Sequence, residues 1–162
     1  MSRKTRPLPT FISSTADIQG DYRYSLTRVW DASLPTLTFV LLNPSTADAT
    51  QLDNTLRRCV DFSIDHGFGS MRILNVYAYR ATKPSVMRAA LDPVGPENDR
   101  TLSTASGTVV AGWGAEVSPE RIAQVLPLLP QLHALKVTKD GHPGHPLYIH
   151  GDARLIEWSP RS

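Results

Sequence analysis

The chain has 162 residues, which is the length of one ordinary domain, and 41% of them are apolar while 20% are charged. This balance is typical of globular proteins and argues against disorder or a membrane-embedded chain. The net charge of +2 permits a partner rich in phosphate but does not require one, because the basic residues would have to cluster on one face.

The single cysteine, Cys59, excludes an internal disulfide and any multi-cysteine zinc or iron–sulfur site, and it fits a reducing compartment. No apolar segment approaches the roughly 20 residues of a membrane span. The N-terminus, MSRKTRPLP, lacks the apolar core of a signal peptide. We therefore expect a cytoplasmic protein with no membrane partner.

The first third of the chain predicts an arm followed by two strands. Residues 1–20 are basic and then polar with two prolines, which indicates an N-terminal arm, and residues 21–162 are expected to form a single α/β domain. The segment 21–30, DYRYSLTRVW, alternates like a strand with one exposed face. It is followed by the apolar segment 36–42, TLTFVLL, and these two segments are candidates for a hairpin.

Helices and buried strands alternate along the remainder of the chain. Capping and apolar spacing predict helices over 53–67, 96–105 and 118–129, and short apolar runs predict buried strands over 71–76, 108–114 and 132–138. Cys59 lies on the apolar stripe of the first helix, where core packing is expected. The pattern predicts a three-layer α/β/α sandwich whose mostly parallel sheet has about four core strands, with an N-terminal antiparallel edge strand or hairpin.

Polar and aromatic residues follow each predicted core strand. In an open parallel sheet, ligands bind outside the carboxyl ends of the strands, where helix N-termini often face the crevice. The residues that this rule brings to one rim are Asn43, Pro44, Ser45 and Thr46, then Asn75, Tyr79, Arg80 and Lys83, then Trp113, and finally Lys139, Asp140 and His142. Turns alone also favour such residues, so the predicted binding site depends on their joint occurrence.

Several familiar chemistries lack their motifs. AGWGAE has no third glycine of a dinucleotide fingerprint, and the chain has neither a phosphate-binding GxxxxGK[ST] loop nor a GxSxG serine elbow. The segment KDGHPGHPLYIHGD holds three histidines and two aspartates, which is enough to coordinate a metal, but its prolines and glycines do not set the ligands on one helical face. We predict no metal site and no cofactor.

The segments YRYSLTRVW, LLNPSTADA, DNTLRRC, NVYAYRAT, DPVGPENDR and TKDGHPGHPLY together resemble the domain-of-unknown-function family 1643 (DUF1643). The resemblance runs from about Tyr22 to Tyr148. Because this family has no assigned activity, the resemblance does not supply a function.

A more distant resemblance is to the uracil-DNA glycosylase superfamily. LLNPS resembles its first motif, with Asn43 at the polar position; NVYAYRATKP resembles its second-strand segment, and HPGHPL resembles its last motif, with His142 at the histidine and Leu147 at the leucine that enters DNA. The chain departs from the pattern at Leu41, which replaces a glycine and could close the pocket. One extra residue in HPGHPL also makes the placement of Leu147 doubtful.

This resemblance implies the hydrolysis of an N-glycosidic bond to a base, which requires stabilisation of charge on the sugar and on the leaving base. The catalytic candidates are Asn43, which can orient a water or read a base edge, His142, which can donate to the leaving base, and Asp48 as an alternative carboxylate. Tyr79 or Trp113 could stack on a flipped base. The residues assigned to substrate binding are Pro44, Ser45, Thr46, Asn75, Tyr79, Arg80, Trp113, Lys139 and Asp140.

Basic side chains could contact the nucleic-acid backbone, and the candidates are Arg57, Arg58 and Lys83. Arg57 is equally explained by a solvated helix face on which it pairs with Asp61. Asp53 and Thr55 are explained by helix capping alone.

Two functions of different classes remain open. One is an enzyme of the base-excision type, acting on DNA or on a modified nucleotide. The other is a binding module that keeps the cleft without catalysis and holds a nucleotide or single-stranded nucleic acid. Leu41 favours the module, whereas Asn43 and His142 favour the enzyme.

Overall fold

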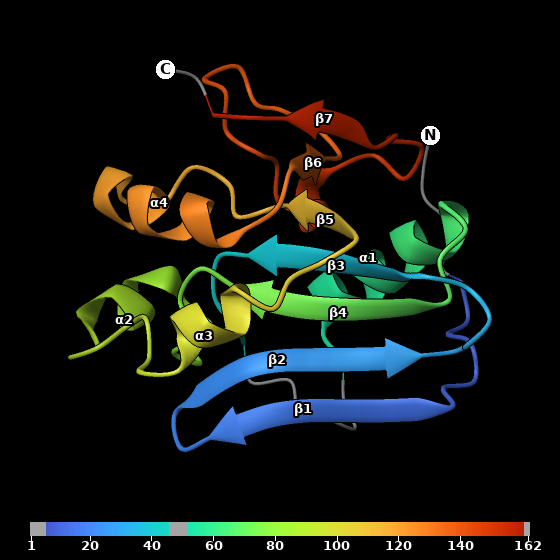
Figure 1. Cartoon of the computed structure of the whole chain (residues 1–162), viewed down its shortest axis with the longest axis horizontal. Helices are drawn as coiled ribbons and strands as arrows, with labels where there is room; N and C mark the ends of the chain where they lie inside the picture. Colours follow the sequence, from blue (N-terminus) through green and yellow to red (C-terminus); the bar gives the residue numbers. More distant parts are fainter. Residues whose placement is uncertain (1–5, 46–51, 161–162) are drawn as a thin grey trace.

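A seven-stranded mixed β-sheet organises the computed structural model, which describes residues 6–45 and 52–160 (Figure 1). The strand order is β1-β2-β4-β3-β5-β6-β7. The strands are β1 (Ser13–Gln19), β2 (Tyr22–Val29), β3 (Thr36–Leu41), β4 (Ser70–Asn75), β5 (Thr108–Ala111), β6 (Leu132–Ala134) and β7 (Ile156–Trp158). The four central strands β4, β3, β5 and β6 run parallel, whereas the pairings of β1 with β2, β2 with β4 and β6 with β7 are antiparallel. The α/β class is confirmed, but a mostly parallel sheet was a wrong prediction for the sheet as a whole.

The predicted hairpin of segments 21–30 and 36–42 does not form. β2 pairs with β1 and β4, and β3 lies between β4 and β5, with Phe39 opposite both Ile73 and Val110. A segment that is apolar on both faces is most stable in the middle of a sheet, and this explains the central place of β3. The hairpin partner of β2 is β1, which lies within the expected N-terminal arm and reaches β2 through a turn at Gly20, whose φ is +60°.

In the part of the chain that the structure describes, four α-helices and two short 3₁₀ helices surround the sheet. They are α1 (Asn54–Asp65), α2 (Pro84–Ala89), α3 (Asn98–Leu102), α4 (Pro119–Val125), η1 (Leu126–Leu128) and η2 (Pro146–Tyr148). Asp53 caps α1 by accepting a hydrogen bond from the Leu56 amide at 2.9 Å, and Ser118 caps α4 in the same way. The three predicted helices exist with shorter bounds, while α2 and β7 were not predicted.

Alternate residues of the central strands pack into two separate hydrophobic clusters. Phe39 packs with residues of α1, whereas its neighbour Val40 packs in the cluster that contains residues of α2, α3 and α4. Successive strand residues point to opposite faces, so α1 covers one face of the sheet and the other three helices cover the opposite face. Cys59 is fully buried in the α1 cluster, as predicted, and this burial raises the pKa of its thiol.

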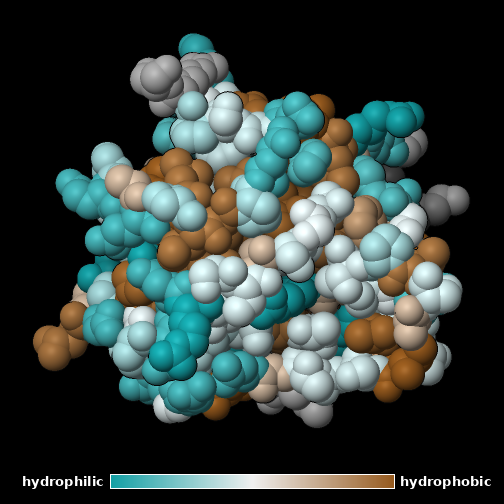
Figure 2. Space-filling model, viewed as in Figure 1, coloured by the Kyte–Doolittle hydropathy of each residue, from teal (hydrophilic) through white to brown (hydrophobic). Residues whose placement is uncertain are grey.

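The surface is uneven in polarity. On the face drawn in Figure 2, apolar side chains gather around α4, while hydrophilic side chains dominate around α3. No helix within the described ranges is both long and apolar enough to cross a membrane.

Candidate functional site

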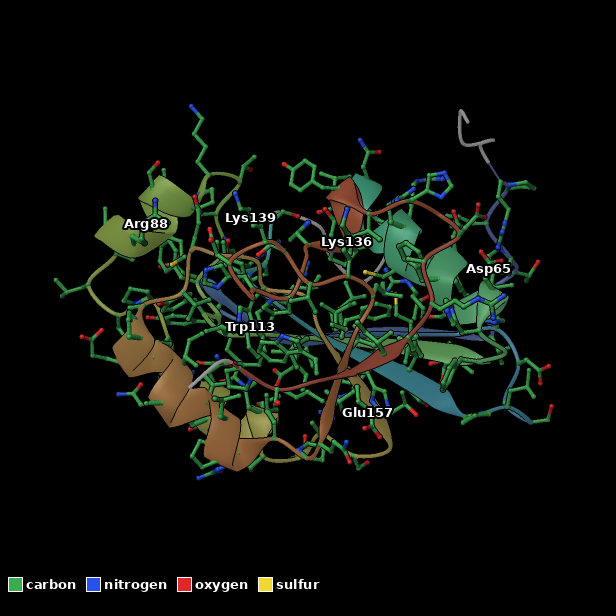
Figure 3. The ribbon with its side chains drawn as sticks, turned by 90° about the horizontal axis from the view of Figure 1, so that it is seen from above. Asp65, Arg88, Trp113, Lys136, Lys139 and Glu157 are labelled. Carbon is green, nitrogen blue, oxygen red and sulfur yellow. The ribbon has the colours of Figure 1, made fainter. Side chains whose placement is uncertain are left out.

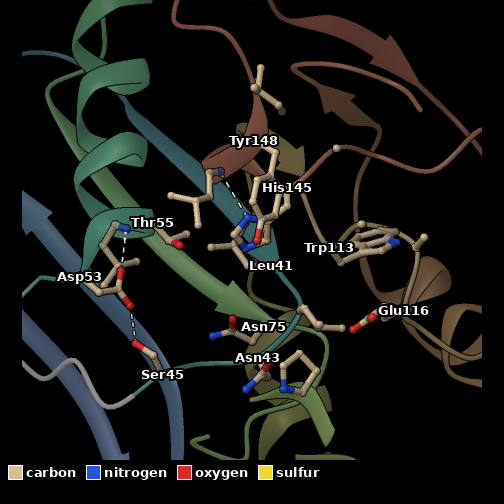
Figure 4. Close-up of a pocket in the computed structure, with 18 of the residues that line it drawn as sticks. Leu41, Asn43, Ser45, Asp53, Thr55, Asn75, Trp113, Glu116, His145 and Tyr148 are labelled. Carbon is tan, nitrogen blue, oxygen red and sulfur yellow. Dashed lines mark hydrogen bonds between the residues drawn. The ribbon is translucent and has the colours of Figure 1, made fainter. Parts of the chain in front are cut away.

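A pocket of about 620 Å³ opens at the carboxyl ends of β3 and β4 (Figure 4). Its volume lies within the roughly 300–1,000 Å³ that is usual for ligand sites. Its walls come from the segments that follow β3, β4 and β5, from the start of α1 and from the loop around η2. The lining residues that carry polar or aromatic side chains are Arg23, Asn43, Ser45, Asp53, Thr55, Asn75, Thr82, Trp113, Glu116, Lys136, Thr138, His145 and Tyr148.

A second hollow lies at the opposite edge of the sheet. It is smaller, at about 440 Å³, and it lies beside β6 and β7; among its described lining residues, Glu157 alone is ionisable. The strand-end pocket therefore has the larger volume and more ionisable lining residues, and it is the candidate site.

Asn75 presents an uncommitted amide to the pocket. It is the last residue of β4, it is 1% exposed, and neither its side-chain nitrogen nor its side-chain oxygen has a hydrogen-bond partner among the described residues. Buried polar groups are usually paired, because leaving one unsatisfied costs about 1–3 kcal/mol. An unpaired donor and acceptor on one planar group therefore mark a place where a ligand with a complementary edge can bind.

A buried polar network fixes the main chain at this point. The Asn98 amide donates to the carbonyls of Asn75 and Val76 at 2.9 and 3.1 Å, and Arg121 donates twice to the Val76 carbonyl, at 3.1 and 2.9 Å. Arg121 also forms an ion pair with Asp99 at 2.8 Å. These bonds hold the carboxyl end of β4 from behind, so the side chain of Asn75 has a defined position.

Asn43 lies beside Asn75 but uses half of its amide in the fold. Its Nδ2 donates to the carbonyls of Pro44 and Ala81, at 3.1 and 2.9 Å. These bonds join the end of β3 to the segment after β4. The carbonyl Oδ1 accepts none of the hydrogen bonds made by the described residues, so it is the part of Asn43 that can act on a ligand or a water.

His145 supplies the imidazole of the pocket. Its Nδ1 accepts from the Leu147 amide at 3.3 Å, which leaves the proton of the neutral ring on Nε2. Burial lowers the pKa of His145, and the charge of Asp53 only partly opposes this shift. The ring is therefore a neutral hydrogen-bond donor near pH 7.

An exposed aromatic ring lies next to His145. The centroid of Tyr148 is 5.7 Å from that of His145, with 46° between the ring planes, and Tyr148 is 82% exposed. Figure 4 shows the two rings together above Leu41. An exposed ring at a pocket entrance can stack on a planar ligand.

Leu41 forms part of the wall without closing the pocket. A side-chain carbon added at Gly112 would lie 3.0 Å from Leu41 and 3.1 Å from Pro146, so Gly112 leaves the room that both side chains occupy. Leu41 is 4% exposed and packs in the cluster with α1. The glycine that the sequence lacks at position 41 is thus not needed to keep a cavity open.

The profile of the family described as "Protein of unknown function (DUF1643)" matches residues 23–147. The chain belongs to the DUF1643 family. No curated protein and no solved structure matches the chain. The DUF1643 match covers all the described pocket residues except Tyr148 and Ile149, so the pocket is a feature of the family region of this chain.

Four of the rim residues that the sequence predicted line the pocket of this DUF1643 protein: Asn43, Ser45, Asn75 and Trp113. Trp113 is only 2% exposed and packs edge-on against Trp158, with centroids 5.5 Å apart. Its ring is therefore mainly part of the core. Thr46 and Asp48 lie outside the described residues.

Six other predicted residues do not line the pocket among the residues that the structure describes. Pro44, Tyr79, Arg80, Lys139, Asp140 and His142 are not among its described lining residues. Figure 3 shows that Lys139 lies on the same side of the molecule as Lys136, which does line the pocket, while Glu157 lies on the other side.

His142 is not among the described lining residues of the pocket, whereas His145 is. Its main chain closes a tight turn, in which the Thr138 amide donates to the His142 carbonyl at 2.8 Å and the His142 amide donates to the Thr138 hydroxyl at 3.1 Å. The turn is held against the sheet, because Trp158 donates to the Gly141 carbonyl at 3.3 Å. HPGHPL contains two His-Pro steps, and the structure brings the second one to the pocket.

The basic residues predicted to contact the nucleic-acid backbone differ in exposure. Arg58 is buried, lies 5.2 Å from the Phe62 ring and donates to the Pro146 carbonyl at 3.2 Å, so these contacts join α1 to η2. Arg57 and Lys83 are exposed. Both remain predictions.

Sequence reasoning missed Arg23, Lys136, His145 and Tyr148 as lining residues. His145 and Tyr148 could have been found by weighing both His-Pro steps of HPGHPL together with the aromatic residue that follows. The alternation of residues 21–30 does not identify Arg23 as a lining residue, because in a regular strand its side chain would lie on the face away from α1.

Proposed function

We propose that this DUF1643 protein binds a nucleobase in the strand-end pocket and hydrolyses the N-glycosidic bond that joins the base to its sugar. The observation that carries the proposal is the buried amide of Asn75, with a donor and an acceptor that have no partner among the described residues. A base edge offers an acceptor and a donor side by side, and an Asn amide matches such an edge with two hydrogen bonds.

The neighbouring groups suit the charges that develop in this reaction. Negative charge grows on the departing base, and the Nε2 proton of His145 can donate to it. Positive charge grows on the sugar, where the carbonyl Oδ1 of Asn43 can orient the attacking water. Tyr148 can stack on the base and offset part of the cost of taking it out of a helix.

The substrate is a nucleotide or a base flipped out of DNA. The resemblance of LLNPS and HPGHPL to uracil-DNA glycosylase motifs supports this choice. The proposal includes the arrangement of that superfamily, in which the sheet lies between two layers of helices. The exposure of Tyr148 and of Leu147, which is 38% exposed, agrees with contact to a large substrate at the entrance.

The second candidate is a binding module without catalysis. It is favoured by the way in which the polar groups of the site serve the fold: Asn43 donates to two main-chain carbonyls, and Asp53 accepts from Ser45 and from the Leu56 amide. Glu116, the other described carboxylate of the pocket, pairs with Arg88 at 3.3 Å. No described carboxylate of the pocket is therefore uncommitted as a general base.

Release of free base from oligonucleotides and nucleotides that carry uracil, hypoxanthine or modified pyrimidines tests both candidates. Asn75→Ala and His145→Ala should lower release at least about 100-fold, as expected for the loss of an aligned donor. His150→Ala is the matched control, because His150 is exposed outside the pocket. Binding that Asn75→Ala abolishes, with no release by the wild type, would select the module. If the protein neither binds these substrates nor releases base from them, the proposal is overturned.

A further inference from the structure

A buried arginine lies in the wall of the pocket, and the alternation of polar and apolar residues in β2 does not predict it. Arg23 is 2% exposed and lines the pocket together with Thr55 and Leu56 of α1. A buried guanidinium is strongly stabilised by negative charge, and its planar set of five N–H donors matches phosphate and carboxylate oxygens.

An irregularity in the pairing of β1 and β2 directs this side chain. Asp17 pairs with Ser25 and Ile18 pairs with Arg23, so Tyr24 has no partner in the register. This is the pattern of a β-bulge, which changes the face on which the following side chains lie.

The contacts of the neighbouring residues confirm the change of face. Tyr24 and Tyr22 both lie toward the loop before α3: their rings are stacked 5.8 Å apart, Tyr22 donates to the Asp92 carbonyl, and the Glu97 amide donates to Tyr24. Leu26, two residues after Tyr24, instead packs with α1 on the other face. Regular alternation would put Tyr24 and Leu26 on one face, and it would turn Arg23 away from α1.

We infer that the bulge at Tyr24 makes the pocket an anion-binding site, in which Arg23 holds a phosphate or carboxylate group of the ligand. This inference rests on the proposed function, since it states that the base arrives as a nucleotide and not as a neutral nucleoside. The five donors of the guanidinium allow it to keep a protein partner and bind a ligand oxygen at once. The hydroxyl of Thr55 and the ammonium of Lys136 line the same pocket and can take further oxygens.

The two carboxylates among the described lining residues have partners of their own. Asp53 is engaged by Ser45 and by the Leu56 amide, and Glu116 is paired with Arg88.

Equilibrium binding of matched ligands tests the inference. The probes are a nucleoside, its 5′-monophosphate, its 5′-carboxylate analogue and inorganic phosphate, each titrated calorimetrically into the full chain. The monophosphate should bind about tenfold or more tightly than the nucleoside, as expected for hydrogen bonds to a charged group. Arg23→Gln should remove this preference, while Arg23→Lys should keep part of it.

The outcomes separate this inference from the proposed function. Equal affinity of the wild type for nucleoside and monophosphate would overturn the anion site while the nucleobase site stands, and this arm holds even if Arg23→Gln fails to fold. If no nucleoside binds but phosphate binds in an Arg23-dependent way, the nucleobase proposal fails and the anion site stands. A preference for the carboxylate analogue over the monophosphate would identify carboxylate as the anion that Arg23 selects.

Discussion

The hydroxyl of Ser45 donates a hydrogen bond to Oδ2 of Asp53, whose other oxygen accepts from the Leu56 amide at 2.9 Å. One carboxylate thus joins the turn after β3 to the first turn of α1. These are two of the walls of the pocket, so the shape of the site depends on a helix cap.

Replacement of Asp53 should destabilise the protein through this cap. Asp53→Ala removes the acceptor of the Leu56 amide and is expected to lower the free energy of unfolding by about 1–2 kcal/mol, as for other N-caps. Urea denaturation measures the change. Asn54→Ala is the matched control, because Asn54 is the exposed next residue and should change stability by no more than about 0.5 kcal/mol. Equal effects of the two variants would contradict the role of the cap.

The hydrogen bonds that Asn98 donates behind β4 should contribute to the stability of the fold. Asn98→Ala leaves the Asn75 and Val76 carbonyls without the amide that they share, and should cost about 2–3 kcal/mol because buried acceptors lose a partner. Chemical denaturation checks the loss of stability.

The same variant should also weaken ligand binding, because the carboxyl end of β4 positions Asn75. Thr104→Ala is a suitable comparison, since its hydroxyl is exposed and accepts from Arg72 on the surface. Binding that stays unchanged in a folded Asn98→Ala protein would show that Asn75 keeps its position without this network.

The sequence predicted the elements whose signal is local. The apolar runs of β3, β4 and β5 and the cap and spacing of α1 are recognisable without tertiary information. The pairing of β2 was missed because its true partner, SSTADIQ, is polar and mostly exposed, and edge strands of this kind lack an apolar signal. β7 was missed because three residues are too few to show a period.

The site was predicted where strand order alone determines it. Asn43 and Asn75 come together because β3 and β4 are parallel neighbours, with Leu41 opposite Asn75. Arg23 depends on a bulge, and the choice between His142 and His145 depends on which His-Pro step belongs to a tight turn. Neither follows from residue type or spacing, since both are settled by tertiary contacts.

The partly buried ring of His145 should make stability depend on pH. Burial lowers the pKa of His145 in the folded protein below its usual 6.5, which the unfolded chain regains. As the pH falls through 6.5, the unfolded chain takes up a proton that the folded chain does not, so stability decreases until the pH reaches the folded pKa. Unfolding free energies between pH 5 and 7.5 should therefore fall less steeply toward acid in His145→Gln than in the wild type. His150→Gln, at an exposed site, serves as the control, and identical slopes in all three proteins would contradict the prediction.

Asn75 should show opposite effects on stability and on binding. Its amide is buried without a partner among the described residues, so Asn75→Leu replaces an unsatisfied polar group by an apolar one of similar size. We expect a gain of about 1 kcal/mol, since removal of a buried unsatisfied group relieves its desolvation cost, together with loss of nucleotide binding. Thermal unfolding should shift upward by about 2–4 °C for a chain of this size. Asn98→Leu is the matched contrast: Asn98 is equally buried in the same region, but its Nδ2 donates two hydrogen bonds, so the same substitution should lower the melting temperature. If Asn75→Leu is as destabilising as Asn98→Leu, the Asn75 amide serves the fold and not a ligand.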